Sequence, residues 1–490
     1  MDQEPADLYS VLGVSRRAAP GEIDAAYEAC LRRIDAGEPA DEAVRERIQY
    51  AHEVLSSQSR RAVYDSLVQE TAGSSLLLDL TFSGETLPLL DTPQLVYAML
   101  KLQPRDGEVK RRPLNLGLVV DRSTSMRGKR LEHVTAAVEL LLGKLSPDDA
   151  LSLVSFSDRA EVVLPAATLG TATQSVDLAA AWHDPRRTLH AITASGGTEI
   201  YHGLRAGLNQ VTRSGMEEHT SHIILLTDGH TYGDADDCLQ LAREAAGRGI
   251  GLTAFGLGAD WNDGFLDALV APSGGQSHFI EGPEDVMPYL AERLQGLGAI
   301  SARNLALKRA WPGQFTLRGG FKLTPLPQPL SADADSVPLG DMEGRSPMTI
   351  LLEFLVAPQT MAARYRFPIE ISYIAPNGAR ESVEQAAELI AKNPSSGERP
   401  PPVPLIEAVR RLNLYRMQEK AWEEAQSGKL DTAVARMRRL TTRYMETGDL
   451  RLAQQAQLEA QQLAHLGTMS AEGRKLLKYG TRSLMGKADI

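Results

Sequence analysis

Apolar residues in the first seventy positions recur at the spacing of α-helices. The pattern predicts helices over residues 7–12, 20–34 and 41–56, and the proline at position 20 suits the first turn of the second helix. One face of the third predicted helix carries Val44, Ile48, Ala51 and Leu55. Residues 1–70 are therefore expected to form a three-helix bundle with a small apolar core.

Beyond residue 74 the apolar residues gather in shorter runs that are typical of strands. The segments SLLLDLTFSG and QLVYAMLKLQP predict a strand pair within residues 75–103. From Leu114 onward the apolar runs LGLVV, LSLVSF, HIILLT and GLTAFGL alternate with helical stretches. Because these runs are continuous, each strand is expected to be buried on both faces, as in a parallel sheet between two helix layers. Residues 111–297 are therefore predicted to form a doubly wound α/β domain.

Strand-like segments return after this α/β domain, in RNLALKRAW, FTLRGGFKL, MTILLEFLV and RYRFPIEISYI. Since strands both precede and follow it, residues 74–110 and 298–376 are predicted to form one β-sandwich that the α/β domain interrupts. Residues 377–404 are assigned to a helix and a stiff proline-rich linker, NPSSGERPPPVP. Residues 405–490 are predicted to form helical hairpins of the tetratricopeptide-repeat kind, because GKLDTA and GDLRLA recur 20 residues apart. The expected fold class is a multidomain chain of α/β, β and α parts.

Composition and charge argue against several classes of function. A net charge of −11 over 490 residues disfavours a general nucleic-acid coat, which needs a basic stripe. No apolar run approaches the roughly 18 residues of a membrane span, and the start, MDQEPADLYS, lacks the pattern of a signal peptide. Cys30 and Cys238 fall in different predicted domains, which disfavours a disulfide framework and fits a reducing compartment. A cytoplasmic location is expected.

Oxygen-bearing side chains follow the strand ends of the predicted α/β domain. The candidate metal ligands are Asp121, Ser123, Ser125, Thr198 and Asp228. The first three follow the run LGLVV, Thr198 precedes a predicted helix, and Asp228 ends the run HIILLT. Ligands of an open parallel sheet gather outside the carboxyl ends of its strands, so these three loops are expected to meet. Oxygen-only ligation with few carboxylates suits Mg²⁺ or Mn²⁺ and disfavours zinc.

The loop DRSTS, the distant Thr198 and the distant Asp228 resemble the metal-ion-dependent adhesion site of von Willebrand factor type A (VWA) domains. The resemblance covers roughly residues 111–296 and extends to the segment AFGLGADWND. It implies a divalent ion held by the hydroxyls of Ser123, Ser125 and Thr198, with the two carboxylates bound directly or through water. It also implies an open coordination position for an acidic group of a protein partner. An intact but unused site is the alternative.

The first seventy residues resemble a J-domain, the module that stimulates the ATPase of heat-shock chaperones. The matching segments are DLYSVLGVSRRAAPGEIDAAYEACLRRID and AHEVLSSQSRRAVYD. The functional His-Pro-Asp tripeptide of that family is absent, because the corresponding segment reads IDAGEPAD. The second helix also carries Glu22, Asp24 and Glu28, where the chaperone-binding face is normally basic. A J-like fold without cochaperone activity is expected, and a retained cochaperone role is the alternative.

No sequence pattern indicates a catalytic nucleophile. The chain lacks a Gly-x-Ser-x-Gly elbow, and neither cysteine stands near a histidine in a known motif. Predicted strand ends carry three histidines, which are expected to be structural: His222, His230 and His278. A metal-dependent hydrolase would need a general base beside the ion. The candidates for such a base are Asp158, Glu199 and Asp234.

The sequence therefore predicts a non-enzymatic, intracellular bacterial adaptor or scaffold. Its α/β domain is expected to capture a protein partner through Mg²⁺ or Mn²⁺, and its helical ends are expected to dock other components. The resemblance to VWA proteins adds an associated ATPase or an assembly machine to the kinds of partner expected. A J-domain cochaperone and, less favoured, a metal-dependent hydrolase are the alternatives.

Overall fold

The computed structural model divides the chain into two compact units, Met1–Ser74 and Ser75–Ile490. The described residues are 8–12, 14, 18, 20–35, 42–57, 61, 74–105, 111–173, 179–213, 219–231, 233–325, 327–330, 336–344, 346–393 and 400–486. Within these ranges, no helix combines the length and the apolar character that crossing a membrane requires.

The first unit contains the helices that the periodicity predicted. They are α1 (Leu8–Leu12), α2 (Pro20–Asp35) and α3 (Glu42–Leu55). Their apolar faces share a small core that includes Tyr9, Leu12, Ile23, Ile48, Ala51 and Leu55. Arg61 closes the bundle, because its guanidinium donates to the Tyr9 hydroxyl over 2.9 Å and to the Ala18 carbonyl over 2.8 Å. The segment that would correspond to the His-Pro-Asp tripeptide of J-domains, residues 36–41, lies outside the described residues.

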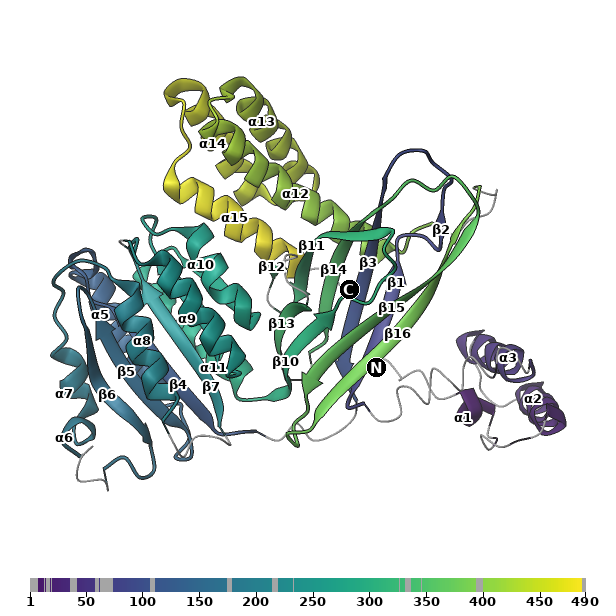
Figure 1. Ribbon diagram of the computed structural model, residues 1–490, viewed down its shortest axis with the longest axis horizontal. Helices are drawn as coiled ribbons and strands as arrows, with labels where there is room; N and C mark the ends of the chain where they lie inside the picture. The colour runs from purple at the N-terminus through teal and green to yellow at the C-terminus, as the bar shows by residue number, and fades with distance from the viewer. Residues whose placement is uncertain are drawn as a thin grey trace. The chain divides into compact units, whose positions relative to one another are not determined.

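A six-stranded sheet forms the centre of the α/β domain (Figure 1). Its strands are β4 (Leu114–Asp121), β5 (Ala150–Phe156), β6 (Ala160–Thr168), β7 (Thr220–Thr227), β8 (Gly251–Leu257) and β9 (Gln276–Ile280). They lie in the order β6-β5-β4-β7-β8-β9, and every neighbouring pair is parallel except β5 and β6. Every residue of β4 is buried, as the continuous apolar run predicted.

Helices cover both faces of this sheet, which confirms the predicted doubly wound arrangement. One buried cluster packs α5 (Lys129–Leu142) and α11 (Val286–Leu297) on the sheet, and a second packs α8 (Ile200–Val211), α9 (Ala235–Gly247) and α10 (Asp263–Val270). Short helical segments are η1 (Thr124–Met126), α6 (Ala179–Trp182), α7 (Pro185–His190), η2 (Ala271–Ser273) and η3 (Pro283–Asp285). Gly203 and Gly207 allow α8 to approach closely, since a Cβ on either would lie 2.5 Å from a side-chain atom of Phe156 or Val119.

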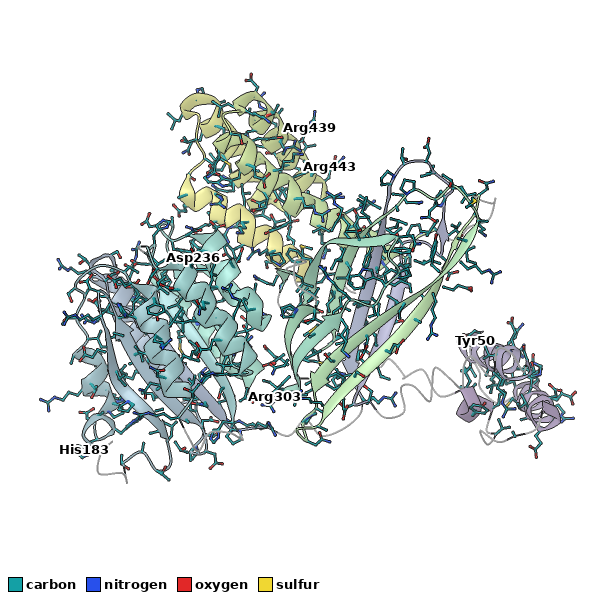
Figure 2. The ribbon with its side chains drawn as sticks, in the orientation of Figure 1. Tyr50, His183, Asp236, Arg303, Arg439 and Arg443 are labelled. Atoms are coloured by element: carbon teal, nitrogen blue, oxygen red, sulfur yellow. The ribbon has the colours of Figure 1, made fainter. Side chains whose placement is uncertain are left out.

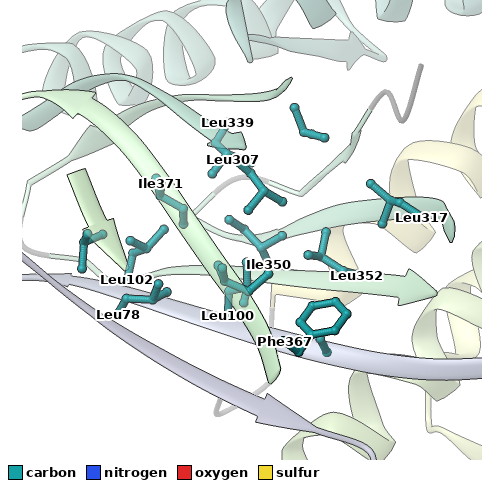
Figure 3. Close-up of a cluster of buried hydrophobic side chains, with 14 of the residues drawn as sticks. Leu78, Leu100, Leu102, Leu307, Leu317, Leu339, Ile350, Leu352, Phe367 and Ile371 are labelled. Atoms are coloured by element: carbon teal, nitrogen blue, oxygen red, sulfur yellow. The ribbon is translucent and has the colours of Figure 1, made fainter. Parts of the chain in front are cut away.

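Two five-stranded sheets form the β-sandwich, and the α/β domain is inserted between its strands β3 and β10. The strands are β1 (Leu76–Phe82), β2 (Thr86–Leu87), β3 (Gln94–Pro104), β10 (Ile300–Lys308), β11 (Phe315–Thr324), β12 (Gln328–Leu330), β13 (Ser336–Glu343), β14 (Met348–Val356), β15 (Ala363–Ile374) and β16 (Arg380–Ala391). The sheet orders are β1-β3-β14-β11-β12 and β13-β10-β15-β16-β2. Leucine, isoleucine and phenylalanine side chains from both sheets interdigitate between them (Figure 3).

The helix predicted at the start of residues 377–404 is wrong. Residues 380–391 form β16, which pairs antiparallel with β15 along its whole length. The sequence RESVEQAAELIA is rich in helix-forming residues, but Val383, Leu389 and Ala391 are buried in the sandwich core. Pairing with β15 and burial of these side chains outweigh the local helix propensity.

Helical hairpins complete the second unit, as the repeated GKLDTA and GDLRLA segments indicated. The helices are α12 (Val403–Gln426), α13 (Leu430–Glu446), α14 (Leu450–Leu466) and α15 (Ala471–Gly486). Gly428 and Gly448 precede α13 and α14 with φ of +75° and +81°, a left-handed conformation that favours glycine at a helix end. Arg439 and Arg443 of α13 are exposed and point to solvent (Figure 2).

Candidate metal and partner-binding site

Asp121 is the last residue of β4 and is fully buried at the carboxyl edge of the sheet. Two hydrogen bonds hold its carboxylate: Oδ1 accepts from the Ser123 amide and Oδ2 from the Thr227 hydroxyl, each over 2.7 Å. Burial raises the pKa of Asp121 to about 6, although these hydrogen bonds act in the opposite direction. The carboxylate therefore has one fixed orientation, set by β4 and by the end of β7.

The two serines of the DRSTS loop connect β4 to the end of β7. The short helix η1 places the Ser123 and Ser125 hydroxyls 3.0 Å apart. Ser125 Oγ donates to Asp228 Oδ1 over 2.6 Å, and Asp228 is fully buried just beyond β7. Two loops that are distant in the sequence thus bring two hydroxyls and a second carboxylate together.

The loop before α8 contributes Thr198 to the same edge. Hydrogen bonds fix this loop, because the Ser195 amide donates to the Arg122 carbonyl over 2.8 Å and the Thr124 amide donates to the Gly196 carbonyl over 3.0 Å. Thr198 is 5% exposed, and a Cβ on Gly229 would lie 3.2 Å from its hydroxyl oxygen. The threonine hydroxyl therefore faces the loop that begins with Asp228. All five residues predicted from the sequence lie in these three adjoining loops.

Arg130 also belongs to this site, although sequence reasoning missed it. It lies in the first turn of α5, and its Nη1 pairs with Asp228 Oδ2 at 2.5 Å. The Arg130 side chain is 32% exposed, whereas Asp228 is fully buried. The sequence signal that could have indicated Arg130 is its position, since it is a basic residue in the first turn of the helix that follows the DRSTS loop. Asp228 consequently accepts from Ser125 on one oxygen and from Arg130 on the other.

The donor set fits a hard divalent cation. Two carboxylates and three hydroxyls supply only oxygen atoms, which suits Mg²⁺ or Mn²⁺ better than zinc. Among the residues that the structure describes, no group of three or more histidine, cysteine, aspartate or glutamate side chains has a metal-binding arrangement. An ion at this edge would thus depend on the serine and threonine hydroxyls.

The three candidate general bases have structural roles in the same loops. Asp158 Oδ1 accepts from the Gly197 amide over 2.7 Å, and Asp234 Oδ2 accepts from the Tyr201 amide over 2.8 Å at the start of α8. Glu199 pairs with His202 at 3.0 Å. Asp158 and Asp234 therefore hold backbone amides in place around the loop that carries Thr198.

Family comparisons match three parts of the chain. Residues 115–286 match the von Willebrand factor type A domain. This part of the chain is a VWA domain. Residues 7–65 match the DnaJ domain, in agreement with the J-like helices, and residues 403–487 match the Sll0103-like, C-terminal alpha-helical domain.

Relatives and solved structures extend the comparison beyond the VWA domain. An uncharacterized protein of Synechocystis sp., sll0103, is 34% identical over 203 residues, which are 41% of this chain and 46% of that protein. The chain thus spans under half the length of the curated relatives it matches first. A von Willebrand factor type A protein from Catenulispora acidiphila has a TM-score of 0.65 at 15% identity, covering 83% of this chain and 96% of its own. The ArnB paralog VWA2 from Sulfolobus acidocaldarius has a TM-score of 0.56 at 15% identity, covering 85% and 100%. These two structures share the fold.

Proposed function

We propose that the VWA domain captures a protein partner through a divalent cation, Mg²⁺ or Mn²⁺, at the carboxyl edge of its sheet. The residues that would hold the ion are Asp121, Ser123, Ser125, Thr198 and Asp228. The observation that supports this proposal is the meeting of three loops that carry only oxygen donors, with both carboxylates buried. When bound, the ion supplies a positive centre that a carboxylate of the partner can coordinate.

The chemistry of the donors favours an acidic partner. The hydroxyls of Ser123, Ser125 and Thr198 are neutral, so they leave a bound ion with much of its positive charge. Carboxylate oxygen is a preferred ligand for Mg²⁺. The attraction between unit charges is only about 1 kcal/mol at about 4 Å in water, but it grows when an interface excludes water.

The candidate bases, the β-sandwich and the helical region also favour a role in protein interaction without catalysis. Asp158 and Asp234 already hold backbone amides, which disfavours either of them as a base for water activation. The β-sandwich supports the VWA domain. The helical region offers a further surface that could bind other proteins, such as an associated ATPase or assembly machine. We infer an intracellular bacterial adaptor, in the cytoplasm, where separate cysteines such as Cys30 and Cys238 stay reduced.

The DnaJ-domain match favours a second candidate function, that of a chaperone partner. Against it, the described part of α2 exposes Glu22, Asp24 and Glu28, and Asp24 Oδ1 lies 2.7 Å from His52 Nε2. The tripeptide His-Pro-Asp does not occur in the sequence segment IDAGEPAD. We therefore propose that the first unit is a docking module without ATPase stimulation.

Calorimetric titration of the full chain with Mn²⁺ and with Mg²⁺ tests the metal site. The wild type should bind about one ion, and Asp121→Ala or Thr198→Ala should weaken binding by about tenfold or more, because each removes a ligand. Thr212→Ala is the matched control: Thr212 is exposed at the opposite end of α8, with its hydroxyl bonded to the Leu208 carbonyl. Equal binding by wild type and Asp121→Ala would overturn the assignment.

A further inference from the structure

Arg130 neutralises one of the two buried carboxylates of the site. Its guanidinium pairs with Asp228 Oδ2 at 2.5 Å, while Asp228 Oδ1 accepts from Ser125. Arg130 Nη1 also lies 3.4 Å from the Ser125 carbonyl oxygen, so the guanidinium contacts both the DRSTS loop and Asp228 beyond β7. An ion that binds Asp228 must therefore share this carboxylate with a permanent positive charge.

The loop after β8 restricts where this guanidinium can move. A Cβ on Gly258, which has φ of +68°, would lie 2.9 Å from Arg130 Nη2. The same loop is tied to α15, because the Trp261 carbonyl accepts from Lys475 Nζ over 2.7 Å and the Ala259 carbonyl accepts from the same ammonium. The loop after β8 thus lies beside the Arg130 guanidinium and is itself tied to α15.

We propose that Arg130 competes with the divalent ion for Asp228 and thereby sets how tightly the VWA domain holds its metal. This inference rests on the proposed function, since it concerns the same site. Two like charges attached to one buried carboxylate repel each other, and partial burial weakens the screening by water. With the divalent ion bound, the positive charge of the ion and Arg130 together exceeds the negative charge of the Asp121 and Asp228 carboxylates. The net positive charge that results suits an acidic partner.

Removing the charge of Arg130 should therefore strengthen metal binding. In Mn²⁺ titrations of the full chain, Arg130→Gln should bind roughly tenfold more tightly than wild type, because the repulsion is lost. Arg130→Lys keeps the charge, so it should stay within about threefold of wild type. Arg127→Gln is the control for a charge just beyond the loop: Arg127 is exposed, and within the described residues it has no ion pair.

A double-mutant cycle separates the ion pair from a general effect of charge. If Arg130 acts through Asp228, then Arg130→Gln should change Mn²⁺ affinity little in an Asp228→Asn background, because both changes break one pair. Equal affinity of wild type and Arg130→Gln overturns the inference and leaves the metal site standing. A gain in Arg127→Gln as large as in Arg130→Gln also overturns it. Failure of wild type and Arg130→Gln alike to bind Mn²⁺ or Mg²⁺ overturns the proposed function, and the inference with it.

Discussion

At the scale of single residues, the VWA domain contains a histidine that folding keeps neutral. His222 is 4% exposed, and its Nε2 lies 2.8 Å from the Thr253 hydroxyl. Burial lowers the pKa of His222 well below its usual value, and the positive charge of Arg293 lowers it further. Unfolding exposes the ring to water, where it takes up a proton below about pH 6.5.

The free energy of unfolding should therefore fall as the pH drops below about 6.5, because only the unfolded chain binds this proton. At pH 5 the loss due to His222 is at most about 2 kcal/mol, the limit for a ring that takes up no proton in the folded chain, and His222→Gln should remove most of it. Urea unfolding at the two pH values measures the difference. The control is His183→Gln, since His183 is exposed on the same domain (Figure 2). An equal loss in wild type and His222→Gln would contradict this account.

At the scale of elements, α15 joins the helical region to the VWA domain through buried charges. Arg482 Nη1 donates to Asp267 Oδ1 over 2.9 Å, and Lys478 Nζ lies 2.9 Å from Asp267 Oδ2. Arg482 and Lys478 are 3% and 4% exposed. Burial alone would raise the pKa of Asp267, but the charges of Arg482 and Lys478 outweigh it and lower that pKa. Asp267 is thus a counter-ion of both buried cations, and Asp263 also pairs with Lys478.

Asp267→Ala should destabilise the second unit strongly, because it leaves Lys478 and Arg482 buried without that carboxylate. The expected cost is about 3–5 kcal/mol. Arg451→Ala is the matched control, since it breaks the exposed Arg451–Glu281 pair across the same junction and should cost under about 1 kcal/mol. Urea unfolding of the two variants measures the difference. Equal, small effects would mean that apolar packing alone holds α15 in place.

At the scale of the whole molecule, the sandwich holds the VWA domain through a buried polar junction. Lys322 of β11 is 2% exposed, and its Nζ donates to the Gly274 carbonyl over 3.0 Å and to the Leu339 carbonyl over 3.1 Å. Arg293 of α11 pairs with Glu343 of β13. The junction involves the amino-terminal ends of β8 and β9, so the carboxyl edge of the sheet, which carries the candidate metal ligands, stays clear of it.

Partner capture by the full chain should therefore depend on the metal and not on the first unit. Pull-down from native lysate in Mg²⁺ should retain a partner that chelator releases and that Ser123→Ala or Thr198→Ala weakens. A chain that lacks residues 1–74 should retain the same partner, because those residues form a separate compact unit. Capture that survives chelator but requires residues 1–74 would instead favour the J-like unit as the binding module.

The sequence alone predicted most elements of the chain and the five candidate ligands of the site. Continuous apolar runs predict buried parallel strands, and the carboxyl ends of parallel strands share one edge, so Asp121 and Asp228 could be placed together. Thr198 was placed at the same edge because it precedes a predicted helix, and the VWA resemblance implies the same ligand. Glycines such as Gly428 and Gly448 marked helix ends because their left-handed conformation is a local requirement.

The tertiary structure decided the features that depend on contacts between distant segments. Local composition favours a helix over residues 380–391, and only pairing with β15 makes that segment a strand. Arg130 and Asp228 are 98 positions apart, and Arg482 and Asp267 are 215 apart, so no spacing rule links them. A charged side chain looks the same in a sequence whether it faces water or a buried counter-ion. The free-energy cost of a charged side chain depends on its burial, and its burial is decided only by the packing of the whole fold.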